Sequence, residues 1–227
     1  MTTLAVHQPN FLPWLGYFDK MASADVFVLI DDVQYVKQSV CNRSKIKNNM
    51  GEAVWLTIPV RISKGWDQNM NEIEMDYAQK WPVKVLNQIR GAYANAPYFK
   101  EHFEKIKDLI TPEYPSLAAL NIALIRYVKD VIGIATKVHV ASELNENFGT
   151  KNDRNMNICK YFKGDTYLSG AGAKKYNDEA LFRNHRISLR YHEFAHPVYP
   201  QINGPFLPNL SVIDLLFNCG PDSRGYV

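Results

Sequence analysis

The chain has 227 residues, of which 46% are hydrophobic and 22% are charged. A chain of this length and composition buries a full hydrophobic core, which excludes a disordered protein. Its 26 basic and 23 acidic residues give a formal net charge of +3, which is too small for general nucleic-acid binding through charge alone. Any binding site for an anion must therefore be local.

The cysteines and the N-terminus are typical of a chain that stays in the cytoplasm. Cys41, Cys159 and Cys219 include no CxxC pair, so we expect neither a zinc site nor a redox couple. The first residues lack the basic and apolar regions of a signal peptide. No apolar stretch reaches the roughly 18 residues of a membrane span. We expect a cytoplasmic protein without a metal site or a membrane span, and its oligomeric state stays open.

The N-terminal part of the chain predicts a strand, a loop, a helix and a second strand. Residues 4–6 and 26–30 are apolar runs, and residues 15–21 carry apolar side chains at helical spacing. If the two strands are parallel, His7–Gln8 lie beside Asp31–Asp32 at the carboxyl edge of the sheet. Open α/β sheets bind ligands at this edge.

The rest of the chain continues the α/β pattern. Polar segments cover 38–49 and 61–72, and further strands are expected at 53–60, 137–141, 166–169 and 187–194. Helices are expected at 79–92, 97–110, 115–132, 153–162 and 210–218, the last with Ser211 as its N-cap. We predict one α/β domain over residues 1–227, with a mostly parallel sheet, flanking helices and a helical insertion at about 79–132.

The segment HQPNFLPWLGYFDK, residues 7–20, has the composition of a ligand-binding loop. It places prolines, a glycine and several hydrogen-bonding side chains directly after a strand, where a structural connection can be short. His7 is the catalytic candidate because histidine transfers protons near neutral pH. Gln8 and Asn10 are binding candidates. The structural alternative is a turn that Pro9, Pro13 and Trp14 stiffen and pack.

The rhythm P-x-x-G-Y, from Pro13 to Tyr17, resembles the P-x-H-x-G-H turn of nucleotidylyltransferases. The histidines of that turn face triphosphate oxygens at a helix N-terminus. Trp14 and Tyr17 stand in their places here. The resemblance implies a degenerate nucleotidylyltransferase-like Rossmann variant, in which the architecture is shared and the histidines are replaced.

Two acids follow the second predicted strand. Carboxylates at this position can hold a metal, accept hydrogen bonds from a sugar or an amine, or act as a base. Adjacent residues of a strand face opposite sides, so only one of the pair enters a given pocket. We take Asp32 as the catalytic candidate and Gln34 as a binding candidate, with a solvated turn pair as the alternative.

Cationic and glycine-rich segments supply candidate anion sites. In CNRSKIK, Asn42 and Arg43 are binding candidates, since arginine grips a phosphate with two parallel hydrogen bonds. A solvated charge run is the alternative. In SGAGAKK, glycines with positive φ let backbone amides approach a phosphate. The candidates there are Ser169, Gly170, Gly172 and Lys174, and a tight turn without a ligand is the alternative.

Two polar side chains near the C-terminus also need an explanation. His192, Glu193 and His196 form H-E-x-x-x-H, which differs from the zinc-protease spacing, so His196 is kept only as a candidate ligand donor. Asp214 lies inside an apolar helix, where an unpaired carboxylate is costly. We expect it to have a partner, with His7 or an arginine as candidates.

The ordered set of HQPNFLPWLGYFDK, DDVQY, CNRSKIK, VWLTIPV, YLSGAGAKKY, HPVYPQ and LSVIDLLFNCG closely resembles the WbqC-like family. This family takes its name from a protein of bacterial O-antigen gene clusters. The resemblance implies a role in surface-polysaccharide (lipopolysaccharide) biosynthesis. The sugars made by such clusters suggest attachment of a glycyl-like group to a nucleotide-linked amino sugar.

The leading hypothesis is a transferase that forms an amide on the amine of a nucleotide-linked amino sugar. The partners are then a nucleotide sugar and an acyl donor. The donor stays open between an acyl thioester, an aminoacyl-tRNA and an acid activated by ATP, so no cofactor is assigned. The alternative is a non-catalytic nucleotide- or sugar-binding scaffold or regulator of the same pathway.

Overall fold

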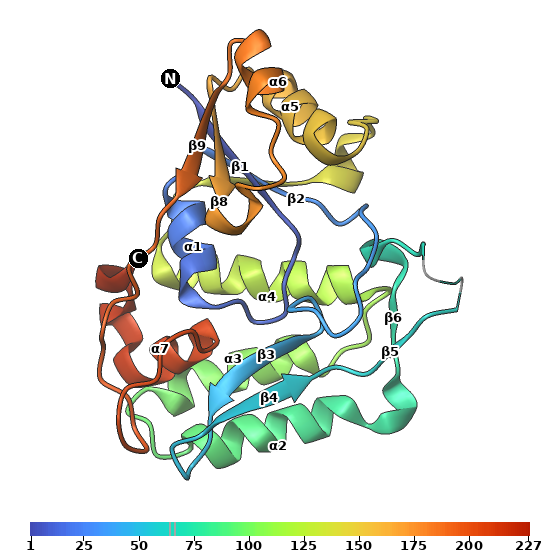
Figure 1. Cartoon of the computed structure of the whole chain (residues 1–227). Coiled ribbons are helices and arrows are strands. Elements are labelled where there is room, and N and C mark those ends of the chain that lie inside the picture. The colour runs from blue at the N-terminus through green and yellow to red at the C-terminus, as the bar shows by residue number, and fades with distance from the viewer. Residues whose placement is uncertain (64, 66) are drawn as a thin grey trace. The chain divides into compact units, whose positions relative to one another are not determined.

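The computed structural model describes the chain except Lys64 and Trp66, which lie in the segment predicted as a polar loop at 61–72. The chain forms two compact units. Unit 1 comprises Met1–Gln8, Gly16–Asp31 and Ile134–Ala195, and unit 2 comprises Pro9–Leu15, Asp32–Gly133 and His196–Val227 (Figure 1). The organisation of residues 1–227 as one domain with an insertion stays a prediction.

Unit 1 contains a five-stranded sheet in the order β7-β2-β1-β8-β9, and every pair of neighbours is parallel (Figure 1). The strands are β1 (Thr3–His7), β2 (Val26–Leu29), β7 (Lys137–Val140), β8 (Thr166–Gly170) and β9 (Ser188–His192). Leu4, Ala5 and Val6 of the central strand are all buried, as is usual for a parallel strand covered on both faces. The predicted α/β class with a mostly parallel sheet is confirmed.

Helices cover both faces of this sheet. Because side chains alternate along a strand, Phe27 and Val28 point to opposite faces. The Tyr17 ring of α1 (Leu15–Ala22) lies 5.5 Å from that of Phe27. Val28 belongs to a core with Ile158 of α5 (Lys151–Tyr161). The sequence analysis did not predict α6 (Glu179–Asn184), because it has only 6 residues.

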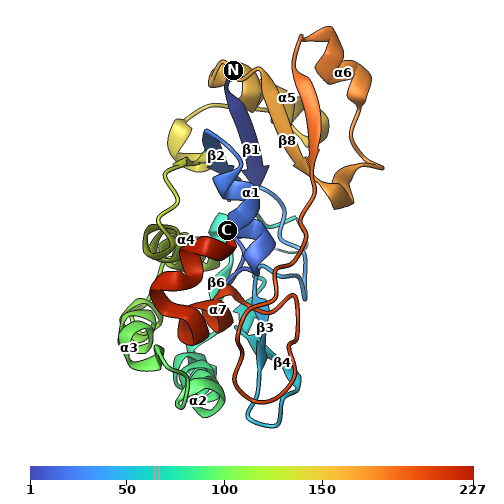
Figure 2. The ribbon, with the colours of Figure 1, turned by 90° about the vertical axis from the view of Figure 1, so that its left-hand side faces the viewer.

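Unit 2 contains a helical layer and two small hairpins. The helices are α2 (Trp81–Tyr93), α3 (Phe99–Ile110), α4 (Leu117–Ile132) and α7 (Val212–Cys219). Figure 2 looks nearly along α2, α3 and α4, which lie one beside the next, and α7 contacts α3. These helices confirm the predicted ones, and Ser211 caps α7 by accepting a hydrogen bond from the backbone N–H of Ile213.

The hairpin of β3 (Arg43–Lys47) and β4 (Ala53–Thr57) corrects the expectation of a polar segment at 38–49. Arg43 and Lys45 alternate with Ser44 and Ile46, which are buried, so the strand period is present with few apolar residues. Gly51 turns the chain with φ +82°, and a Cβ there would lie 2.6 Å from the Asn203 carbonyl oxygen.

Short elements complete the fold. The second hairpin is β5 (Val60–Arg61) with β6 (Glu74–Met75), and 3₁₀ turns cover Met70–Glu72, Tyr77–Gln79, Ala141–Leu144, Ala171–Ala173 and Gly220–Tyr226. In the part of the chain that the structure describes, no helix has the length and apolar character needed to cross a membrane.

Candidate functional site

The carboxyl ends of the parallel strands bring several candidates to one edge of unit 1. His7 is the last residue of β1, and it pairs in register with Leu29 at the end of β2. The Ile30 amide donates to the His7 carbonyl oxygen at 2.9 Å, and Asp31 follows directly. At the other side of β1, Gly170 of β8 pairs with His192 of β9. The predicted parallel pairing of the first two strands is confirmed, and a shared pocket lined by His7 and an acid stays a prediction.

His7 is held in one tautomer. Its Nδ1 lies 3.1 Å from the Gln8 carbonyl oxygen, which can only accept, so Nδ1 carries the proton and Nε2 keeps a lone pair. Desolvation and the charge of Lys20 lower the pKa of His7 from 6.5 to about 3. The imidazole is therefore neutral at pH 7. This corrects the expectation that it changes protonation near neutral pH, and its catalytic role stays a proposal.

Lys20 of α1 is a functional candidate that the sequence analysis missed. Its side chain is buried, and Nζ donates to the Val6 carbonyl oxygen at 2.9 Å. Desolvation lowers the pKa of Lys20 to about 8. This burial could not be predicted, because a lysine between the apolar positions of an amphipathic helix is normally solvated.

The two acids after β2 lie in different environments. Asp31 is buried and accepts hydrogen bonds from the Ser142 amide at 3.1 Å and the Ser142 hydroxyl at 2.6 Å. It therefore ties the end of β2 to the residues after β7. Asp32 belongs to unit 2 and is partly exposed. Gln34 is exposed, and its amide donates to Asp67 at 3.4 Å. The roles of Asp32 and Gln34 stay predictions.

Asp19 and His192 form an acid–histidine contact in unit 1 that was not predicted from the sequence. The Nε2 of His192, at the end of β9, is hydrogen-bonded to Oδ1 of Asp19 in α1. A carboxylate on one ring nitrogen fixes the orientation of the imidazole. The partners are far apart in the chain, so no local motif could have revealed them.

The SGAGA segment is built differently from the expected glycine loop. Gly170 has φ −68°, and neither it nor Gly172 has a positive φ. A Cβ at either position would meet nothing within 4 Å, so the fold requires neither glycine. Ser169 is buried, and its hydroxyl accepts from the Asn177 amide at 2.9 Å. Lys174 is exposed. The positive-φ argument for this segment is wrong, and phosphate binding there stays a prediction.

The Trp14–Trp55 pocket lies wholly in unit 2 and has a volume of about 290 Å³. Its lining residues come from two predicted segments and the hairpin: Asn10, Phe11, Pro13, Trp14, Val40, Arg43, Ser44, Lys45, Trp55 and Asn209. Trp14 is 36% exposed and Trp55 40% exposed, which is unusual for such large aromatic side chains. The structure thus brings Asn10 and Arg43 to one pocket.

Arg43 and Lys45 are the cations of this pocket. The guanidinium carbon of Arg43 lies 4.3 Å from the Trp55 ring centre, and Lys45 Nζ lies 5.0 Å from it. The Nε of Arg43 is buried and has no hydrogen-bond partner among the residues that the structure describes. A buried donor without a partner is unfavourable, so this position favours an acceptor from outside the chain.

Buried side chains hold the loop that forms the pocket wall. The hydroxyls of Ser44 and Ser211 donate to the Leu12 carbonyl oxygen at 2.7 Å and 2.9 Å. The amide of Asn121 donates to the carbonyls of Pro9 and Cys41, each at 2.8 Å. Leu12 itself has φ +40°, a strained value for a side-chain-bearing residue. The loop is therefore pre-formed rather than dependent on a ligand.

The remaining candidates lie outside this lining. Asn42 is buried, and its amide donates to the Ile58 carbonyl oxygen at 2.9 Å. His196 donates from Nδ1 to the Pro197 carbonyl oxygen at 2.8 Å. Their binding roles stay predictions.

Asp214 is fully buried and accepts hydrogen bonds from Tyr93 at 2.8 Å and Tyr199 at 2.9 Å. The expectation that Asp214 has a partner is confirmed, but the partners are two tyrosines and not His7 or an arginine. Neutral tyrosine hydroxyls bind the carboxylate at lower desolvation cost than a buried guanidinium.

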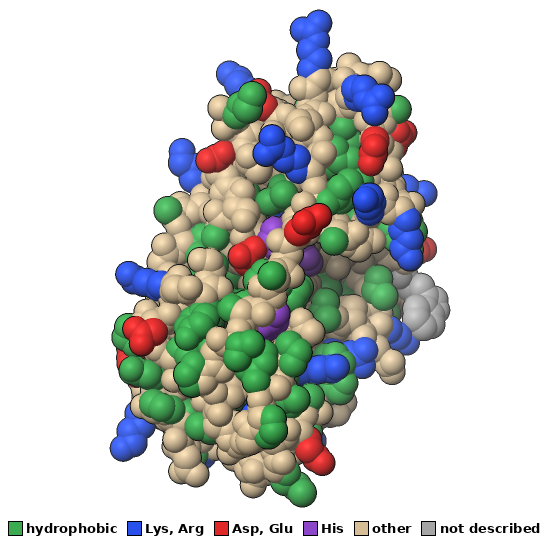
Figure 3. Space-filling model, turned by 60° about the vertical axis from the view of Figure 1, so that its left-hand side comes forward, with side chains coloured by type: hydrophobic (Ala, Val, Ile, Leu, Met, Phe, Trp, Pro, Cys, Tyr) green, Lys and Arg blue, Asp and Glu red, His purple; other side chains and the backbone are tan. Residues whose placement is uncertain are grey.

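Charge on the visible surface is mixed. Figure 3 shows Lys and Arg side chains interspersed with Asp and Glu, without one large basic area on this face. This agrees with a net charge of only +3 and with local rather than extended anion sites.

The fold and its site residues define an α/β protein with a parallel sheet and an aromatic, cationic pocket. The chain matches the WbqC-like protein family over residues 8–226 and belongs to that family. It is 31% identical over 233 residues to a Mycobacterium tuberculosis (strain ATCC 25618 / H37Rv) protein named Uncharacterized protein Rv1507c, covering 100% of this chain and 98% of the relative. No solved structure matches it.

Proposed function

We propose that the protein binds a nucleotide-linked amino sugar in the Trp14–Trp55 pocket and transfers an acyl or aminoacyl group to the sugar amine. The observation that carries the binding step is Arg43, whose buried Nε lacks a partner among the described residues beside an exposed indole. A nucleobase or the apolar face of a sugar stacks on an indole face, and a guanidinium donates hydrogen bonds to the oxygens of a diphosphate.

The charges of the pocket support this ligand class. Arg43 and Lys45 line it, and no Asp or Glu is among its lining residues. A diphosphate therefore meets two cations without a competing carboxylate in the lining. Asn10 adds an amide that can bind sugar hydroxyls.

Amide formation needs a proton acceptor, because only a neutral amine attacks an acyl group. His7 and Asp32 remain our candidates from the sequence. His7 would act through the lone pair on Nε2, as a weak base with a pKa of about 3.

Calorimetric titration with a uridine diphosphate amino sugar tests the binding step. Arg43→Ala should weaken binding at least tenfold, while the free energy of unfolding should fall by no more than about 1 kcal/mol because Arg43 is only partly buried. Arg61→Ala is the matched control, since Arg61 is exposed and pairs with Asp76 at 2.7 Å. Equal affinities for the wild type and Arg43→Ala would remove the pocket from the proposal.

A non-catalytic binding protein of the same pathway is the second candidate. The low pKa of His7 favours it, because such a histidine is a poor base at neutral pH. Mass spectrometry of the bound sugar with thioester, aminoacyl-tRNA and ATP-plus-acid donors distinguishes the two. An acylated sugar supports the transferase, and binding without any product supports the scaffold.

A further inference from the structure

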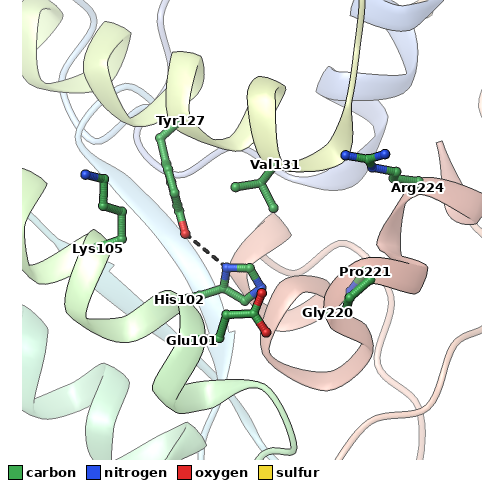
Figure 4. Close-up of a pocket in the computed structure, with 8 residues that line it drawn as sticks. All are labelled: Glu101, His102, Lys105, Tyr127, Val131, Gly220, Pro221 and Arg224. Atoms are coloured by element: carbon green, nitrogen blue, oxygen red, sulfur yellow. Dashed lines mark hydrogen bonds between the residues drawn. The ribbon is translucent and has the colours of Figure 1, made fainter.

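A second pocket lies in unit 2, with a volume of about 580 Å³ (Figure 4). It is lined by residues of α3, α4 and the C-terminal 3₁₀ turn: Glu101, His102, Lys105, Tyr127, Val131, Gly220, Pro221 and Arg224. None of them lines the Trp14–Trp55 pocket. The volume lies within the usual range for small-molecule sites.

His102 sits in the wall of this pocket with only half of its hydrogen-bonding capacity used. It is 4% exposed, and its Nδ1 lies 3.0 Å from the Tyr127 hydroxyl (Figure 4). Its Nε2 is buried and has no hydrogen-bond partner within the described part of the chain. In a neutral imidazole one nitrogen donates and the other accepts, so Nε2 offers a hydrogen bond in either tautomer.

Both members of this pair are uncharged near neutral pH. Desolvation lowers the pKa of His102 below its ordinary value, although the Glu101 charge opposes this. Desolvation and the Glu101 charge raise the pKa of Tyr127 to about 12. The centre of the pocket wall is therefore polar and neutral, with one carboxylate beside it.

Two cations flank this centre. In Figure 4, Lys105 and Arg224 lie on opposite sides of the His102–Tyr127 pair, and the Glu101 carboxylate lies beside the His102 ring. Among the described residues, neither cation has an ion pair, and Glu101 has none either. The two cations and one carboxylate give the lining one excess positive charge. The carboxylate of Glu101 can accept hydrogen bonds from hydroxyl or amine donors.

Close packing fixes the position of the wall that carries Arg224. A Cβ on Gly133, which ends α4 with φ +78°, would lie 3.1 Å from Arg224 Nε. A Cβ on Gly220 would lie 2.4 Å from the Tyr98 ring, so the start of the turn lies directly against Tyr98. The cation is therefore placed by the packing of the turn, rather than on a loose tail.

We propose that this pocket binds an anionic polyol, of the class of sugar phosphates and sugar acids. The anionic group lies at Arg224, Lys105 adds to the positive potential of the lining, hydroxyl groups donate to the Glu101 carboxylate, and one further group pairs with His102 Nε2. Val131 and Pro221 offer apolar surface to the C–H face of the sugar. This site does not depend on the function proposed for the Trp14–Trp55 pocket.

Calorimetry of the full chain at low salt, with glucose 6-phosphate, galacturonate and inorganic phosphate as probes, tests this site. Arg224→Gln and Lys105→Gln should each weaken binding of the preferred sugar anion at least tenfold. Lys107→Gln is the matched control, because this lysine lies on α3 outside the lining and pairs with Glu104 at 2.5 Å. Glu101→Gln should reduce the preference for the sugar anion over inorganic phosphate.

Nitrogen-15 spectra of the His102 ring give an independent result. Sugar anion at the wild-type dissociation constant should shift the Nε2 resonance in the wild type, and the same concentration should shift it much less in Arg224→Gln. The proposal is overturned if no probe binds, if both glutamine variants bind as the wild type does, or if inorganic phosphate binds as tightly as the sugar anions.

Discussion

The guanidinium carbon of Arg43 lies 4.3 Å from the centre of the Trp55 ring, in a pocket that also contains Trp14. The strand period of β3 puts Arg43 and Lys45 on the same side of the hairpin, and their register pairs them with Thr57 and Trp55. The hairpin thus presents two cations and an indole together.

Trp55→Ala should weaken nucleotide-sugar binding about fivefold to a hundredfold, because stacking of a base on an aromatic side chain contributes roughly 1–3 kcal/mol. The free energy of unfolding should change by no more than about 1 kcal/mol, since the side chain is 40% exposed. Calorimetry and urea denaturation measure the two quantities. Trp55→Phe should recover part of the affinity, and an affinity unchanged in Trp55→Ala would exclude stacking there.

His7 should remain neutral, with its proton on Nδ1, from about pH 5 to pH 8, because its pKa is lowered to about 3. The native state then binds fewer protons than the unfolded chain between about pH 3 and pH 6.5, so this group makes stability rise with pH in that window. Ring nitrogen-15 shifts report the tautomer directly. Lys20→Met should raise the pKa of His7, since the Lys20 charge is one cause of its depression.

Asp214 should make stability fall as pH rises, which is the opposite of the pH dependence expected from His7. Burial raises its pKa above the ordinary 3.8, so the native state binds this proton more tightly than the unfolded chain does. Its contribution to stability is therefore lost as pH rises from about 4 through the raised pKa. Urea denaturation from about pH 4 to pH 7 should show a smaller loss of stability with pH in Asp214→Asn than in the wild type. Equal slopes of unfolding free energy against pH in the wild type and Asp214→Asn would contradict a raised pKa for Asp214.

The glycines of SGAGA should be replaceable without loss of the fold. Gly170→Ala and Gly172→Ala should change the free energy of unfolding by less than about 0.5 kcal/mol, because a Cβ at either meets nothing within 4 Å. Gly220→Ala is the contrasting variant, because its Cβ would lie 2.4 Å from the Tyr98 ring. Thermal unfolding should give a clearly lower melting temperature for Gly220→Ala than for Gly170→Ala and Gly172→Ala. If the segment binds phosphate, Gly172→Val should lose that binding with the fold intact.

The centre of unit 1 could be predicted because β1 and β2 contain unbroken apolar runs. Leu4 to Val6 and Val26 to Leu29 leave no alternative to buried parallel strands once a helix connects them. The hairpin strand Arg43–Lys47 was missed because its alternation is carried by polar residues. Lys47 is fully buried, and its ammonium group donates hydrogen bonds to the carbonyl oxygens of Gly204 and Pro205 at 3.0 Å and 2.6 Å. These partners lie far from Lys47 in the sequence. No local pattern contains that information.

The candidate site, like the fold, could be predicted only in part from the sequence. The loop from His7 and the cationic segment at Arg43 were chosen for their residue types, and Asn10 and Arg43 do meet in one pocket. Trp55 was missed because a tryptophan in a strand is normally a core residue. Lys20 and the Asp19–His192 pair were missed because their environments come from contacts between separate elements.

The indole N–H resonances of the nitrogen-15-labelled protein give the most direct test of nucleotide-sugar binding at the Trp14–Trp55 pocket. Trp→Phe variants assign Trp14, Trp55 and the buried Trp81, which is 1% exposed and lies outside the lining. On titration with a uridine diphosphate amino sugar, Trp14 and Trp55 should shift and saturate together, while Trp81 stays in place. Saturated binding by calorimetry with both resonances unmoved would contradict the account.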